Sequence, residues 1–126
     1  MLSVAIDLCK NIIDYLRNEN QLRLEDKLRV SMILNEISDI LLDTSNKLKL
    51  DEYPHYNCVL MEKLANDLHF RLIDHIKPDE LDKLHSVLME ASQIEKQYTW
   101  RKDPQTIPSI EKAAAEFKSF SILMKV

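Results

Sequence analysis

The sequence predicts an all-α protein, a single domain built as a five-helix antiparallel bundle. Three observations lead to this fold class. Apolar residues recur at steps of three and four along five segments, which is the spacing of one face of an α-helix. The 126 residues contain no glycine, which tight two-residue β-hairpins usually need. The length corresponds to one domain, and no internal repeat or low-complexity tract divides it.

The first two helices are expected at about 2–18 and 22–48. The asparagine-containing stretch 17–21 breaks the apolar pattern between them, because Asn tolerates the left-handed conformation that ends a helix. The apolar face of the first helix consists of Leu2, Ala5, Cys9, Ile12 and Leu16. That of the second consists of Leu24, Leu28, Val30, Ile33, Leu34, Ile37, Leu41 and Leu48.

The next two helices are expected at about 54–77 and 78–98, and a proline marks the start of each. Proline suits the first turn of a helix, where its missing N–H has no partner to lose. Pro78 also disfavours helical geometry at Lys77, so the third helix should end there. Their apolar faces are Met61, Leu64, Leu68, Leu72 and Ile76, and then Leu81, Leu84, Leu88, Ala91 and Tyr98.

The last helix is expected at 109–124, after a connector over 99–108 that holds two prolines and no periodicity. Ser109 or Thr106 would be its N-cap, because a hydroxyl can accept a bond from an unpaired N–H of the first turn. Its apolar face consists of Ile110, Ala113, Ala114, Phe117, Phe120 and Met124.

Charge and composition exclude several classes of protein. The net charge of −4 opposes bulk attraction to nucleic acid, and only 98–102 mixes aromatic with basic residues. Without glycine, a P-loop or a dinucleotide-binding fingerprint cannot form in its usual way. No apolar run approaches the ~20 residues that span a bilayer. With two cysteines, Cys9 and Cys58, we expect a cytoplasmic protein without a disulfide.

No metal, cofactor or catalytic group is expected. His55 and Cys58 would share one helix face, but a structural zinc site needs a second close pair of ligands, and the sequence has none. Cys58 is also the one candidate nucleophile, since a helix start and a nearby His can lower the pKa of a thiol. A buried, inert thiol is the alternative interpretation.

A ribonuclease of the HEPN type is the enzymatic alternative. Its pattern is an Arg, four to six residues and a His, whereas three residues separate Arg71 from His75. At this i, i+4 spacing the two side chains can instead pair with acids on their own helix.

Two helices carry more apolar residues than one buried face requires. The additional positions are Val4, Leu8 and Tyr15 on the first helix and Met32, Ile40 and Leu42 on the second. A helix that is apolar over most of its circumference lies between neighbours or contacts a partner. The partner interpretation predicts that these six residues bind another protein or a second copy.

The stretch 30–72, with Ile37-Ser38-Asp39-Ile40-Leu41 followed by Tyr53-Pro54-His55-Tyr56-Asn57-Cys58, resembles the effector-associated domains of bacterial signalling and conflict proteins. The resemblance implies a non-enzymatic adaptor that recruits a partner by helix–helix contact in bacterial defence. Pro54, His55 and Cys58 would then set the corner between the second and third helices. The chain departs from those modules where they place Gly, before the Pro and after the His. A small acidic inhibitor or immunity protein is the alternative function, because an acidic bundle can cover a basic site.

Overall fold

The computed structural model describes residues 24–72, 78–92 and 104–125. Helices are the only regular secondary structure in these ranges, so the all-α prediction is confirmed. They are α2 (Leu24–Lys49), α3 (His55–Leu72), α4 (Pro78–Ala91) and α5 (Thr106–Met124). The helix predicted at 2–18 and the connector over 99–103 lie outside the described residues.

Four predicted boundaries agree with the structure to within one residue, and two are wrong. α3 begins at His55, one residue after the expected position 54, and α5 ends at Met124 as expected. α2 ends within one residue of the expected position 48, and α4 begins at Pro78. α4 was expected to reach 98 but ends at Ala91, and the hydroxyl of the following Ser92 donates to the Met89 carbonyl at 2.6 Å. Such a local bond competes with the helical pattern. Residues 73–77, the predicted end of α3, are outside the described ranges.

The predicted start of α5 is also wrong. The helix begins at Thr106, three residues before Ser109, and Pro108 lies within the first turn, where no N–H is needed. Neither predicted cap residue has that role. The N-cap is Gln105, whose side chain makes no capping bond, and its carbonyl accepts the N–H of Ser109 at 3.0 Å.

The end of α2 shows how a chain without glycine makes a tight corner. Asp51 adopts a positive φ of 57°. Its N–H donates to the Leu48 carbonyl at 3.1 Å, and that of Glu52 donates to the Lys47 carbonyl at 2.9 Å. These are the two bonds of a Schellman motif, whose left-handed position is usually glycine and here is aspartate. The motif turns the chain toward α3.

α2 and α5 pack as an antiparallel pair through small residues. Ser31 and Ser121 each donate a hydroxyl hydrogen bond to the other's backbone carbonyl, both at 2.8 Å, and Ser38 donates to the Ala114 carbonyl at 2.7 Å. Ser38 follows Ser31 by seven residues on α2, and Ala114 precedes Ser121 by seven residues on α5. The two helices therefore keep the same alignment at both contacts. A serine hydroxyl reaches the backbone of a neighbouring helix only when the two backbones approach closely.

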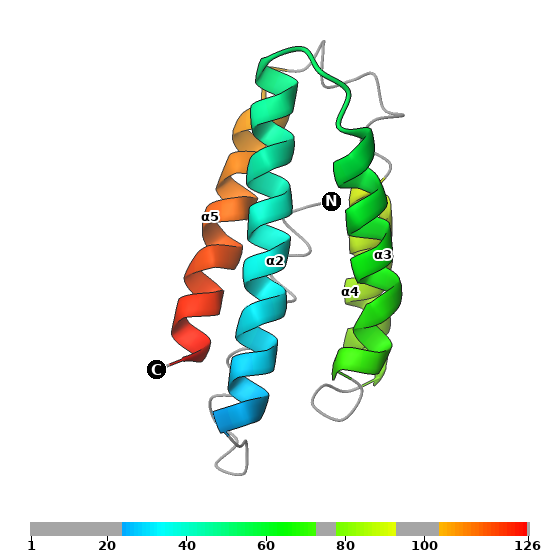
Figure 1. Ribbon diagram of the computed structural model, residues 1–126, viewed down its shortest axis with the longest axis vertical. Helices are drawn as coiled ribbons and strands as arrows, with labels where there is room; N and C mark the ends of the chain where they lie inside the picture. Colours follow the sequence, from blue (N-terminus) through cyan, green and yellow to red (C-terminus); the bar gives the residue numbers. More distant parts are fainter. Residues whose placement is uncertain (1–23, 73–77, 93–103, 126) are drawn as a thin grey trace.

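The core is one cluster of buried apolar side chains. The apolar face predicted for α5 is completely buried, and so are six residues predicted for α2: Val30, Ile33, Leu34, Ile37, Leu41 and Leu48. α2 lies between α5 and α3, and α4 packs against α3 on the far side in this view (Figure 1). Among the described helices, none has the length and apolar character needed to cross a membrane.

Replacing Ser121 by Leu should destabilise the protein by about 2 kcal/mol. The larger side chain overpacks the close contact and removes the bonds between Ser121 and Ser31. Urea denaturation followed by circular dichroism measures the loss. Ser119→Leu is the matched control on the exposed side of α5 and should change stability by less than about 0.5 kcal/mol. Equal effects of the two variants would contradict the close packing of α2 and α5.

Candidate interaction surface

The outward face of α2 exposes apolar side chains. Met32 is 58% and Leu42 49% exposed, and Leu28 is also exposed on this face. Met32 and Leu42 are two of the predicted partner-binding residues. Ile40 is another, but it is half-buried, packs against the core and lines the groove toward α3. Val4, Leu8 and Tyr15 lie outside the described residues, so three of the six predicted residues are located.

α3 exposes a second apolar set. Tyr56, Val59 and Phe70 follow one another at steps of three and then eleven residues, which keeps them on one side of the helix. Phe70 is 89% and Val59 47% exposed. Tyr53, in the corner before α3, is exposed as well. We call Tyr53, Tyr56, Val59 and Phe70 the α3 surface.

A groove with a volume of about 330 Å³ lies between α2 and α3. Its apolar lining is Ile40, Leu60 and Leu64. Charged side chains of both signs complete the lining: Glu36, Asp39, Lys63, Asp67 and Arg71. The two helices are joined by polar contacts at either end of this groove.

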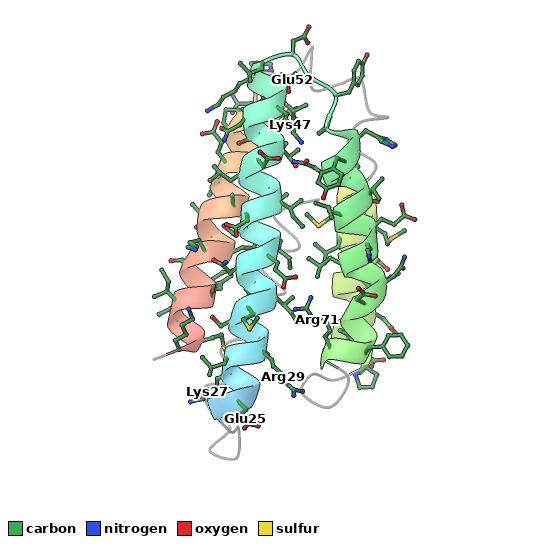
Figure 2. The ribbon with its side chains drawn as sticks, in the orientation of Figure 1. Glu25, Lys27, Arg29, Lys47, Glu52 and Arg71 are labelled. Atoms are coloured by element: carbon green, nitrogen blue, oxygen red, sulfur yellow. The ribbon has the colours of Figure 1, made fainter. Side chains whose placement is uncertain are left out.

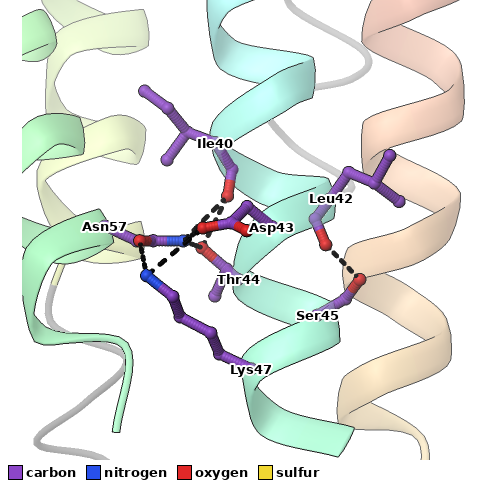
Figure 3. A network of polar contacts seen from close by, with 7 residues as sticks. All are labelled: Ile40, Leu42, Asp43, Thr44, Ser45, Lys47 and Asn57. Carbon is purple, nitrogen blue, oxygen red and sulfur yellow. Dashed lines mark hydrogen bonds and ion pairs between the residues drawn. The ribbon is translucent and has the colours of Figure 1, made fainter. Parts of the chain in front are cut away.

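The first of these polar contacts centres on Asn57, a buried residue in the first turn of α3 (Figure 3). Its amide nitrogen donates to an Asp43 carboxylate oxygen at 2.9 Å and to the Thr44 hydroxyl at 3.1 Å. Its amide oxygen accepts a bond from Lys47 Nζ at 2.7 Å. Lys47 also pairs with Asp43 at 3.3 Å and lies 5.8 Å from the centre of the Tyr56 ring. The network fixes the start of α3 on the last turns of α2.

These contacts change the acidity of Asp43. The hydrogen bond from Asn57 lowers the pKa of this carboxyl below its ordinary value of 3.8, and the bond and positive charge of Lys47 act in the same direction. Partial burial opposes them. A carboxylate that accepts such bonds stabilises the folded protein only while it is ionised.

The second polar contact joins Arg71 of α3 to Glu36 of α2. Two guanidinium nitrogens donate to the two carboxylate oxygens at 2.9 and 3.0 Å. Figure 2 shows Arg71 extending from the lower part of α3 toward α2. The pair with Glu36 raises the pKa of Arg71 above its ordinary value. Arg71 therefore joins two helices. His75, its predicted partner in a ribonuclease site, lies outside the described residues.

The predicted corner residues divide into two kinds. Pro54 and Cys58 are buried, and the Cys58 N–H donates to the Pro54 carbonyl at 3.0 Å, which makes Pro54 the N-cap of α3. His55 is exposed at the first helical position. Cys58 is buried in the core and is not part of a disulfide. In the described part of the chain, no three His, Cys, Asp or Glu residues gather closely enough to bind a metal ion.

The α3 surface was not predicted from the sequence. The residue spacing predicted the buried face of this helix, and Val59 and Phe70 are apolar residues that do not belong to that face. Met32 and Leu42 were identified on α2 by the same feature, an apolar residue outside the predicted buried face. The buried Asn57 was not predicted either, because its side-chain hydrogen-bond partners come from positions 43, 44 and 47 of another helix.

Comparisons of the chain with known protein families, with curated protein sequences and with solved structures find no match. The resemblance of 30–72 to effector-associated domains therefore stays a prediction.

Asp43→Asn should reduce the pH dependence of stability. Because the folded pKa of Asp43 is lowered, its stabilising contribution is present above the ordinary value of 3.8 and is lost as the pH falls through the folded pKa. The variant should therefore be less stable than the wild type at pH 6 and closer to it at about pH 2.5. Urea unfolding at the two pH values measures this. A constant difference would contradict the assigned cause.

A double-mutant cycle should show coupling between Glu36 and Arg71. Two parallel bonds between half-exposed side chains are expected to contribute about 0.5–1 kcal/mol. The variants are Glu36→Gln, Arg71→Gln and their combination, measured by urea unfolding. A cycle of Glu36→Gln with Lys63→Gln is the control and should show almost no coupling. No coupling in the first cycle would mean that the pair does not hold α3 to α2.

Proposed function

We propose that this protein is a non-enzymatic interaction module that binds a protein partner through the exposed apolar faces of α2 and α3. The observation that supports this most directly is the α3 surface. Four large apolar or aromatic side chains lie exposed on one helix and its preceding corner. Burying a Phe or Val side chain contributes roughly 1.5–3 kcal/mol, and aromatic residues are frequent among the residues that dominate binding energy.

The attachment of α3 makes this surface suitable for recognition. The Asn57 network holds the start of the helix, and the ion pair of Arg71 with Glu36 holds its last turn. A helix fixed at both ends loses little conformational freedom when a partner binds. Preorganisation of this kind increases affinity without additional contacts.

The sequence suggests the size, compartment and biological role of this module. The module would be a five-helix domain acting in the cytoplasm, with the helix over 2–18 contributing Val4, Leu8 and Tyr15 to partner binding. The resemblance of the region 30–72 suggests an adaptor role in bacterial defence. An acidic inhibitor would also bind a protein, but mainly through charge, so the salt dependence of binding distinguishes the two.

Phe70→Glu and Val59→Glu should each weaken partner binding by about 30-fold or more, because a buried unpaired carboxylate replaces an apolar contact. The measurement is capture by the tagged protein from cells that make it, with quantitative mass spectrometry at low and high salt, followed by calorimetry with the captured partner. Stability should change little, since both side chains are exposed.

Ser119→Glu is the matched control, since it adds the same charge to an exposed position on α5. It should bind like the wild type. A partner that is lost at high salt and retained by both α3 variants would contradict the proposal and favour the inhibitor function.

A further inference from the structure

The outward face of α2 has the residue spacing of a coiled coil. Its positions alternate in steps of four and three residues, and all are exposed except the half-buried Asn35: Leu28, Met32, Asn35, Asp39, Leu42 and Asn46. Steps of four and three residues keep side chains along one side of a helix, which is the side that meets the second helix in a coiled coil. α5 occupies a different face, the one with Ser31 and Ser38. The Lys118 ammonium of α5 donates to the Asn35 amide oxygen, and Asp39 lies at the edge of the groove toward α3. Leu28, Met32 and Leu42 nevertheless stay exposed.

From this pattern we infer that a second copy of the chain binds there, with the two α2 helices antiparallel about a two-fold axis near position 37. The inference rests on the proposed interaction function and assigns the occupant of the α2 face. The seam of a coiled coil consists of a positions and d positions, and in antiparallel pairs the a positions of one helix face the d positions of the other. Met32 of each copy then lies opposite Leu42 of the other, and Asn35 lies opposite Asp39.

In this register, apolar residues lie opposite apolar residues and polar residues opposite polar residues along most of the seam. The pair of Met32 with Leu42 occurs twice because of the two-fold symmetry. The Asn35 amide can donate to the Asp39 carboxylate of the second copy, as it already does to its own Asp39 at 3.3 Å. Leu28 lies opposite Asn46 at the two ends. A shift of one heptad in either direction would place Leu28 or Leu42 opposite Asp39, which would bury a carboxylate against an apolar side chain.

Charge favours the same orientation. Beside the seam, Arg29 of one copy approaches Asp43 of the other, and Figure 2 shows Arg29 near the beginning of α2. The two Glu36 side chains lie near the axis, where each is neutralised by its own Arg71. Parallel helices would instead place Asp39 against Asp39, and like charges in contact oppose association. The antiparallel dimer leaves both α3 surfaces free for a partner.

Sedimentation equilibrium of the purified chain at tens of micromolar should show a dimer. Met32→Lys and Leu42→Lys should each weaken dimerisation by about 100-fold, because each change occurs twice in a symmetric interface and costs about tenfold per site. Val59→Lys is the matched control, since Val59 is similarly exposed on α3, and it should remain dimeric. A monomeric wild type, or a dimer lost only in Val59→Lys, would overturn the inference.

Disulfide trapping tests the orientation with variants that keep the seam uncharged. In a Cys9→Ser background, Met32→Cys and Leu42→Cys should not cross-link alone, whereas their mixture should form a covalent dimer on oxidation. Self-linking of each variant, or no cross-link in the mixture, would overturn the antiparallel pairing.

Failure of this inference is distinguishable from failure of the proposed function. A monomer that loses its partner in Phe70→Glu contradicts only the dimer. A dimer that captures no partner at either salt concentration contradicts only the proposed function.

Discussion

The close approach of α2 and α5 is the contact on which the rest of the structure depends. Serine and alanine along the shared face let the two backbones come near enough for hydroxyl groups to bond to the carbonyls of the opposite helix. Each such bond contributes about 0.5–1.5 kcal/mol, and a larger side chain there would separate the helices. The pairing sets the rotation of α2. Its remaining sides therefore face the core, α3 and the outside.

α3 is attached differently, and this difference produces the candidate surface. Its contacts with α2 include a buried amide network at one end and a bidentate ion pair at the other, with an apolar-lined groove between them. Polar attachments of this kind fix a helix in one orientation because their geometry is directional. Val59 and Phe70 consequently stay exposed, although they are apolar. A dimer through α2 would display two such surfaces on opposite copies.

Much of the fold could be predicted from residue spacing, because local periodicity reflects which side of a helix is buried. The buried residues of α2 and α5 follow this rule closely. Boundaries were less predictable where two local signals compete. At α5, both Thr106 and Ser109 have hydroxyl groups that could cap the helix, but the helix begins after Gln105, whose side chain forms no cap. The candidate site was predicted in part, through Met32 and Leu42, whereas Ile40 faces the groove.

The sequence by itself determined that the described residues are helical, where α3 and α4 begin, and which residues are apolar beyond the needs of a core. Only the tertiary structure decided which of those residues stay exposed. The physical reason is that exposure depends on neighbours that are distant in sequence. Arg71 became a link to Glu36 because packing brought positions 35 residues apart together. Asn57 became a buried anchor in the same way, and the outward faces of α2 and α3 are those that no described helix covers.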